Sequence, residues 1–342
     1  MSTAGARMAE EVAEQPAVFD SIVARRGDLA GVAELVAARR PRFALLAARG
    51  SSDHAALYAK YLIEVLLQLP AGLVSPSTTT LYGARPDFTD VLYLSVSQSG
   101  GSPDLVAATA AAREQGALTI AVTNTPASPL SAAAELSVDI KAGEELAVAA
   151  TKTYSATLLS LYLLVDAIRG GKGEAVADIG ELATTALSAP IEEAVERYGH
   201  VERVVTTGRG YSSATAFEAA LKLAETSYLA ARSYSGADLL HGPVAAIDAG
   251  TGVVAVTSEG RGGAAMRDVV ATVRERGADV LAVGSASADM PAGLRIDVPA
   301  TAEEVAPILE ILPLQRLALA LSLARGGDPD QPRGLSKVTR TL

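Results

Sequence analysis

Short apolar runs alternate along this chain with longer segments in which apolar residues recur every three or four positions. Such short runs are typical of buried strands, and the longer spacing is typical of amphipathic helices. In the first half, the pattern predicts strands near residues 43–48, 72–75, 91–96, 118–123 and 136–140. In the second half, it predicts strands near 203–207, 232–235, 252–257, 279–284 and 294–298. Strands that alternate with helices indicate parallel sheets with helices on both faces.

The two halves of the chain also resemble each other in sequence. Ser97 matches Ser258 and Gly116 matches Gly277, and both pairs are 161 positions apart. A fixed offset over several matches indicates an internal duplication. We therefore expect an α/β protein of two tandem flavodoxin-like domains, each a doubly wound parallel sheet in three αβα layers.

The segments around the two repeats complete the expected organisation. Residues 1–40 read as an amphipathic helical arm that could pack across a subunit boundary. We expect the first domain at 41–185, a linker at 186–200 and the second domain at 201–325. Residues 326–342 lack the periodicity of a core element, and their prolines and glycines favour a fixed path over the surface.

Composition narrows the class of protein. The net charge of −10 argues against nucleic acid as a partner. The absence of cysteine excludes disulfides, thiolate metal sites and a cysteine nucleophile, and the three histidines lack the spacing of a metal site. The acidic N-terminus and the lack of a long uncharged apolar run favour neither a secretory signal nor a membrane span. We expect a soluble cytoplasmic protein that handles a small molecule and binds no metal.

The polar segment 97–104, which follows the third predicted strand, carries the strongest chemical signal. Its small side chains let backbone N–H groups approach an anion, and the helix that follows adds a favourable dipole. The residues 50–52 follow the first strand, and both loops flank the crevice where the strand order of such a sheet reverses. An ordinary Ser/Gly turn is the alternative. The shared crevice favours a cradle for the phosphate of a small metabolite.

Six motifs, in order, resemble those of the sugar isomerase (SIS) domain family: ARGSSDHAALYAKYLIE, SVSQSGGSPD, AGEELAVAATKTY, GRGYSSATAFEAALKLAETSY, DLLHGP and DPDQPRGLSKV. The likeness covers nearly the whole chain. It extends to the isomerase half of glutamine–fructose-6-phosphate aminotransferase and to glucosamine-6-phosphate deaminases of the same fold. The resemblance implies a small phosphorylated sugar as ligand and a homodimer with its active site at the subunit interface.

The resemblance also implies roles for individual residues. The implied phosphate-binding residues are Ser52, Ser97, Gln98, Ser99 and Ser102. The implied sugar-binding residues are Ser51, Val148 and Thr151. The implied catalytic residues are Glu225 as the base, Glu218 beside it, His241 for ring opening and Lys337 as the Schiff-base amine. Residues 326–342 would then form a tail that closes the active site.

The roles of these residues can also be judged from their own chemistry, without the family resemblance. Glu218, Lys222 and Glu225 share one helix face, and a solvated face with an ion pair is the alternative reading. The other residues of this helix are mostly Ala and Leu, which favours carboxylates suited to proton transfer. His241 precedes Gly242 and Pro243, a sequence typical of a tight turn. Lys337, taken alone, would be read as exposed, because it lies near the C-terminus. Schiff-base chemistry needs a neutral amine, so the tail would have to fold over a desolvating pocket.

These observations predict a deaminating aldose–ketose isomerase, with glucosamine 6-phosphate converted to fructose 6-phosphate and ammonia. No organic cofactor is expected, because the imine is itself the electron sink. The chain has neither a cysteine nor the separate domain with which glutamine-dependent aminotransferases release ammonia. Two alternatives stay open. One is a different ketose- or fructosamine-phosphate isomerase or deglycase, and the other is a non-catalytic sugar-phosphate sensor. Phosphate is expected only in the first repeat, because Glu259 brings a negative charge to the duplicate loop.

Overall fold

A computed structural model describes residues 3–337 of the chain. The residues fall into two compact units. The first-repeat unit consists of Val18–Glu145, Ala156–Ala177 and Ser336–Leu342. The second-repeat unit consists of Met1–Ala17, Leu146–Ser155 and Asp178–Leu335. The last five residues of the predicted tail lie outside the described residues.

All ten predicted strands are present, in two sheets of five parallel strands each. The first sheet contains β1 (Phe43–Ala47), β2 (Ala71–Leu73), β3 (Val91–Val96), β4 (Leu118–Thr123) and β5 (Leu136–Asp139), in the order β2-β1-β3-β4-β5. The second contains β6 (Arg203–Gly208), β7 (Ala230–Ser235), β8 (Thr251–Val256), β9 (Asp279–Gly284) and β10 (Leu294–Asp297), in the order β10-β9-β8-β6-β7. Both orders are the flavodoxin-like order, so the predicted fold class is confirmed.

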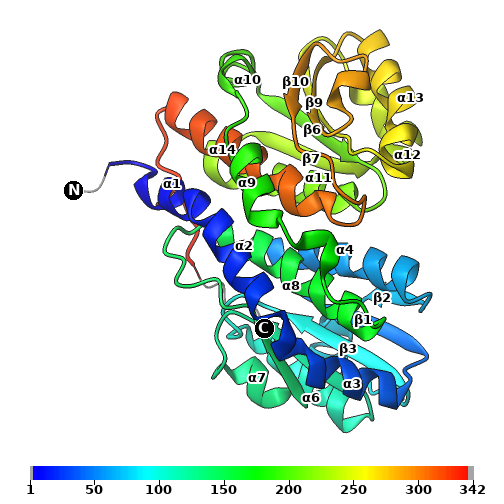
Figure 1. The fold of residues 1–342 in the computed structure, drawn as a ribbon. Helices are drawn as coiled ribbons and strands as arrows, with labels where there is room; N and C mark the ends of the chain where they lie inside the picture. The colour runs from blue at the N-terminus through cyan, green and yellow to red at the C-terminus, as the bar shows by residue number, and fades with distance from the viewer. Residues whose placement is uncertain (1–2, 338–342) are drawn as a thin grey trace. The chain divides into compact units, whose positions relative to one another are not determined.

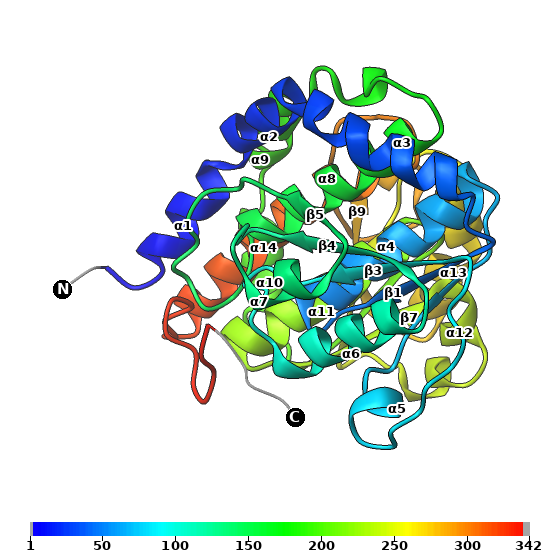
Figure 2. The same ribbon diagram turned by 90° about the horizontal axis from the view of Figure 1, so that it is seen from below.

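Helices cover both faces of the first sheet. The helical elements of this region are α2 (Gln15–Ala24), η1 (Arg26–Leu29), α3 (Ala30–Arg39), α4 (Ser51–Leu66), α5 (Ser77–Thr80), α6 (Pro103–Glu114), α7 (Pro129–Ala133), α8 (Lys152–Ile168) and η2 (Glu174–Val176). Helix α4 contacts β1, β2 and β3, and it lies above the sheet in Figure 1. Helices α6 and α7 lie below it, on the near side in Figure 2, over a core of Tyr93, Leu105 and Leu130. Strand β4 is buried throughout because both faces are covered.

The second sheet has the same layers. Its helical elements are α9 (Ile179–Leu187), α10 (Glu192–Tyr198), α11 (Ser212–Ser227), α12 (Gly236–Leu240), η3 (Pro243–Ala246), α13 (Arg261–Glu275), η4 (Ser287–Asp289) and α14 (Ala306–Ala324). Helices α12 and α13 pack on one face, where Leu239, Met266 and Val270 are buried against β8 and β9. Helix α11 packs along β6 and β7 and also contacts α14 extensively.

The structure confirms the internal duplication at matching turns. Gly116 ends α6 with a φ of +96°, and Gly277 ends α13 with a φ of +90°. At both positions a Cβ atom would lie 3.4 Å from its nearest neighbour, at Thr89 and Ala249 respectively. A positive φ favours glycine, so the same residue is required for the same turn in each repeat.

The predicted N-terminal arm is helical, and its first helix packs within its own unit. In α1 (Ala6–Ala13), Met8 and Val12 are buried against Ala147, with Leu187 and Leu319 beside them. The amphipathic pattern of α1 therefore has an apolar partner in the same chain. This packing explains the amphipathic pattern without a contact to a second subunit.

Polar contacts hold the described part of the C-terminal tail at Asp330 and Arg333. The Asp330 carboxylate accepts hydrogen bonds from the backbone N–H groups of Arg7 at 3.0 Å and Met8 at 2.9 Å, at the start of α1. The N–H of Arg333 donates to the Tyr228 hydroxyl at 2.9 Å. A carboxylate at a helix N-terminus is favourable, so the arm and the tail stabilise each other.

Among the described residues, one helix is long and apolar enough to cross a membrane by length and composition. This helix is α14, and 78% of its most apolar window is buried inside the protein. Core helices of globular proteins share these properties, and α14 packs on α11, α9 and α10. Its apolar composition is explained by this packing.

Candidate functional site

The loop between β3 and α6, residues 97–102, is here called the cradle loop. It folds back on its own hydroxyl groups: the Gly100 N–H donates to Ser97 Oγ at 3.2 Å, and the Gly101 N–H donates to Ser99 Oγ at 3.3 Å. Gly100 has a φ of +60°, and a Cβ atom there would lie only 2.2 Å from Ser128 Oγ. Glycine is therefore required for the path of this loop.

At the N-terminus of α6, which follows the cradle loop, the Asp104 carboxylate accepts a hydrogen bond from the Leu105 N–H at 2.9 Å, and the N-cap side chain makes none. Ser102 is the N-cap residue, in an extended conformation, and its side chain makes no capping hydrogen bond. Pro103 follows at the first helical position and has no N–H to satisfy. The positive end of this 12-residue helix is thus compatible with an anion supplied from outside the loop.

The turn after β1 lies beside the cradle loop, as the strand order predicted. Gly50 precedes α4, whose first two residues are Ser51 and Ser52. The Arg49 guanidinium forms an ion pair at 2.9 Å with Asp104, which is 3% exposed in the first turn of α6. This ion pair joins the two loops. The sequence pattern indicated Ser51 and Ser52 in this turn but not the cation that Arg49 contributes.

Lys337 belongs to the first-repeat unit and is held by a buried carboxylate. Its Nζ lies 2.7 Å from Glu145 Oε2, and the Glu145 side chain is 0% exposed while that of Lys337 is 26% exposed. Glu145 lies in the motif AGEELAVAATKTY, and its role as the partner of Lys337 was not predicted. A buried acid is seldom found without a partner, so this ion pair helps to hold both side chains in place.

Glu218, Lys222 and Glu225 form a buried row on α11. Lys222 Nζ lies 3.4 Å from Glu218 and 2.5 Å from Glu225. Glu218 and Lys222 are completely buried, whereas the Glu225 side chain is 23% exposed. Burial lowers the pKa of Lys222, but the two carboxylates outweigh it, so the net shift is upward. The solvated face considered as an alternative is wrong, although the ion pair that it included is present.

Val148 and Thr151 lie in Leu146–Ser155, the sugar-site segment, which buried polar groups hold in place. The Thr151 carbonyl accepts a hydrogen bond from Gln315 at 3.0 Å, and Gln315 also accepts one from Gln15 at 2.9 Å. The Glu11 carboxylate of α1 accepts a hydrogen bond from the Ala147 N–H at 3.2 Å. These contacts are separated by more than 100 residues in sequence, so no local pattern predicts them.

His241 follows α12 at the predicted tight turn. Gly242 has a φ of +138°, and Pro243 begins η3. His241 is exposed. Within residues 3–337, its imidazole has no hydrogen-bond or ion-pair partner. The turn therefore presents the ring to solvent rather than to Glu225, which belongs to the same unit.

The predicted site residues divide between the two units. The first-repeat unit holds Ser51, Ser52, Ser97, Gln98, Ser99, Ser102 and Lys337. The second-repeat unit holds Val148, Thr151, Glu218, Glu225 and His241. Within each unit, the structure brings the two predicted loops together at Arg49 and Asp104, and it brings Glu218 and Glu225 together at Lys222.

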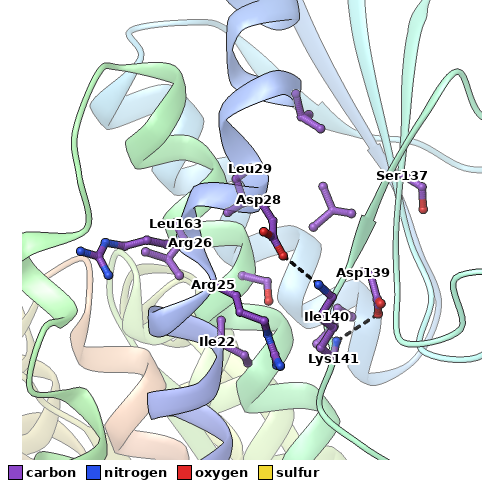
Figure 3. Close-up of a pocket in the computed structure, with 13 residues that line it drawn as sticks. Ile22, Arg25, Arg26, Asp28, Leu29, Ser137, Asp139, Ile140, Lys141 and Leu163 are labelled. Carbon is purple, nitrogen blue, oxygen red and sulfur yellow. Dashed lines mark hydrogen bonds and ion pairs between the residues drawn. The ribbon is translucent and has the colours of Figure 1, made fainter.

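A small pocket of about 180 Å³ lies in the first-repeat unit and includes none of the predicted site residues. Figure 3 shows Asp28, from η1, directed at Lys141 beyond the end of β5, where their charged atoms are 2.8 Å apart. The Arg26 guanidinium donates to the carbonyls of Lys172 and Val23. The charged groups that line this pocket are thus largely paired with other groups of the protein.

Comparison with known families and structures identifies the class of protein that this fold and site define. A model of the SIS domain matches residues 39–167 and 199–325. These two segments are the two repeats, so the chain belongs to the SIS domain family.

Individual relatives agree with this assignment. The chain is 35% identical to a glutamine–fructose-6-phosphate aminotransferase (isomerizing) of Gloeobacter violaceus, over 96% of this chain and 58% of that protein. The chain thus spans less than two thirds of this curated relative. A crystal structure from Silicibacter pomeroyi, of a candidate phosphosugar isomerase, is 34% identical, with a TM-score of 0.89 over 94% of this chain and 99% of that chain.

The glucosamine-6-phosphate deaminase of Thermotoga maritima shares the fold. Its TM-score is 0.76 at 23% identity, over 98% of this chain and all of that chain. At this level of identity, the likeness concerns the fold alone.

Proposed function

We propose that this protein is a sugar-phosphate aldose–ketose isomerase that deaminates an amino-sugar phosphate, with glucosamine 6-phosphate as substrate. The products are fructose 6-phosphate and ammonia. The observation that carries the proposal is the row of Glu218, Lys222 and Glu225 on α11. A carboxylate that is partly exposed, yet held at 2.5 Å by a fully buried lysine, suits the transfer of a proton between two adjacent carbons.

The cradle loop is proposed to bind the phosphate of the sugar. The N-terminus of α6, where Ser102 makes no capping hydrogen bond, and the small side chains of residues 97–102 supply donors. Arg49 adds a cation at the edge of the cradle, 45% exposed and anchored by Asp104. The hydroxyls of Ser52, Ser97, Ser99 and Ser102 would complete the phosphate contacts.

Proton transfer is proposed to proceed from the open-chain amino aldose. His241 opens the ring by acid–base catalysis. Glu225 then removes the proton from C2 and returns one to C1, which converts the aldehyde and amine into a hydroxymethyl group and an imine at C2. Lys222 keeps the Glu225 carboxylate in one position, and Glu218 balances the charge of Lys222 in the apolar interior.

Lys337 is proposed to release the ammonia. Its amine, after giving a proton to Glu145, adds to the C2 imine and expels ammonia, which leaves a lysine Schiff base. Water hydrolyses this Schiff base to the ketose and regenerates the free amine. The Glu145 carboxylate, 2.7 Å from Nζ, is placed to accept the lysine proton.

A second copy of the chain is proposed to complete the site. His241 is exposed at a rigid turn, and the neighbouring Leu240 is 40% exposed. An exposed imidazole beside an exposed apolar side chain is compatible with a contact across a homodimer interface. The proposal therefore keeps the homodimer with an interface active site, without relying on the N-terminal arm.

Replacing Ser99 by alanine is expected to weaken binding of the sugar phosphate by roughly 10- to 100-fold, because a hydrogen bond to a charged group contributes about 1.5–3 kcal/mol. The loss should appear in KM, with kcat changed little. Ser137→Ala is the matched control, since Ser137 is exposed on β5 and its hydroxyl bonds to that of Ser131. Titration calorimetry with fructose 6-phosphate measures the effect. Equal affinities for the Ser99 and Ser137 variants would contradict the assignment of the cradle loop.

The experiment that tests the proposed function is an assay of ammonia release from glucosamine 6-phosphate in the absence of glutamine. Because the assay contains no glutamine, ammonia released in it must come from the amino group of the sugar. Release of ammonia together with fructose 6-phosphate supports the deaminase. Interconversion of a non-amino ketose phosphate without ammonia would favour the simpler isomerase.

A further inference from the structure

The second repeat contains a loop that corresponds to the cradle loop, and a carboxylate of the same chain occupies it. This duplicate loop, residues 258–263, joins β8 to the 15-residue helix α13. Glu303, from the segment that precedes α14, reaches its first turn. The Glu303 carboxylate accepts hydrogen bonds from the Arg261 N–H at 3.0 Å and from the Gly262 N–H at 2.7 Å.

The backbone of the duplicate loop closes tightly around this carboxylate. A Cβ atom on Gly260 would lie 2.4 Å from the Glu303 carboxyl group, and one on Gly262 would lie 2.9 Å from Glu303 Oε1. Gly260 also has a φ of +131°. Glycines that permit such an approach at a helix N-terminus are typical of loops that hold oxyanions. Here the oxyanion is a side chain.

The duplicated hydroxyls are turned toward a second internal carboxyl group. Ser212 follows β6 as Ser52 follows β1, and Ser258 is the counterpart of Ser97. Ser212 Oγ donates to Glu310 at 2.8 Å and lies 3.2 Å from Ser258 Oγ. Glu310 is completely buried on α14, and burial raises its pKa to about 7. The hydroxyls that would face a ligand in the first repeat are therefore engaged within the protein in the second.

We propose that the second repeat retains an oxyanion-binding cradle in which Glu303 takes the place of phosphate, and that removal of this carboxylate opens the cradle to inorganic phosphate or sulfate. The native chain then binds phosphate in its first repeat alone. The sequence also predicted phosphate in the first repeat alone, on the basis of the negative charge of Glu259. In the structure Glu259 is exposed, and it is Glu303 that contacts the helix N-terminus. This proposal goes beyond the proposed function and does not depend on it.

The test counts phosphate ions bound by the Glu303→Ala variant. Equilibrium dialysis with labelled inorganic phosphate should give one more phosphate per chain for this variant than for the native protein. Its midpoint of thermal unfolding should fall without phosphate and recover when phosphate is added, because the ion again satisfies the two N–H groups. Glu259→Ala is the matched control, and it should bind as many phosphates as the native protein. An unchanged count in the Glu303 variant would overturn the proposal.

A second measurement covers the case in which the variant does not fold. Crystals of the native protein grown in sulfate should show Glu303 on the N–H groups of Arg261 and Gly262, with no sulfate there. A sulfate that displaces Glu303 in the native protein would overturn the proposal. Neither measurement uses turnover, so failure of the proposed function leaves both readouts intact.

Discussion

Glu225→Gln is expected to lower kcat for the isomerisation by roughly 10²–10⁴-fold and to leave KM nearly unchanged. The amide keeps the shape of the carboxylate but cannot accept and return the C2 proton. Incorporation of deuterium from the solvent at C1 of the fructose 6-phosphate formed, followed by NMR, measures the step directly. The exchange should be lost in parallel with kcat.

The matched control for this prediction is Glu202→Gln, which changes an exposed carboxylate ahead of β6. Lys222 keeps Glu218 as a partner at 3.4 Å in the Glu225 variant, so the fold should persist. Glu225→Asp, which keeps the charge but shortens the side chain, should fold and be slow. Near-native deuterium exchange in Glu225→Gln would assign proton transfer to another residue.

Lys337→Met is expected to abolish both the release of ammonia and any adduct that borohydride traps with a ketose phosphate. Methionine has no amine with which to form the imine. Mass spectrometry of the borohydride-treated protein should find the sugar on Lys337 in the native chain and nowhere in the variant. Binding of fructose 6-phosphate through the cradle loop should persist.

This substitution also removes a cation from beside the buried Glu145, so a charge-preserving variant is needed. Lys337→Arg keeps a cation against Glu145, yet it cannot form a Schiff base under these conditions. It should fold as the native protein does and lack the adduct. Lys172→Arg provides the same change at a turn outside the predicted site. Full ammonia release by Lys337→Arg would show that Lys337 is not the nucleophile.

The strands and their layers were predictable because their signal is local. Strand β4 reads as a mostly apolar run, and the structure buries every one of its residues under helices on both faces. The 161-residue offset matches Gly116 with Gly277, and the structure gives both glycines a positive φ after a helix. The strand order followed from the flavodoxin-like alternation of strands and helices.

The polar contacts that complete the candidate site were not predictable, because they join residues far apart in sequence. Glu145 and Lys337 are 192 positions apart, and nothing near either residue indicates the other. Glu303 reaches Arg261 over 42 positions, whereas the acidic residue inside the duplicate loop, Glu259, is exposed. Local charge therefore predicted that an anion is unfavourable at this loop, but it did not identify the carboxylate responsible.

The contacts of α1 illustrate a similar limit. An amphipathic helix needs an apolar partner, but its pattern does not specify whether that partner belongs to the same chain. The structure provides Ala147, Leu187 and Leu319 from its own unit. The Asp330 carboxylate at the N-terminus of α1 then depends on a tail segment too polar to be recognised as a structural element.

The most direct test of the account is the stoichiometry of ammonia and fructose 6-phosphate formed from glucosamine 6-phosphate by the purified chain. Glutamate dehydrogenase measures the ammonia, and phosphoglucose isomerase with glucose-6-phosphate dehydrogenase measures the ketose phosphate. The account predicts equal amounts of the two products, formed without glutamine or added metal, and no product from the Glu225→Gln variant. Sugar-phosphate binding by a folded protein that releases no ammonia from this substrate would contradict the deaminase assignment.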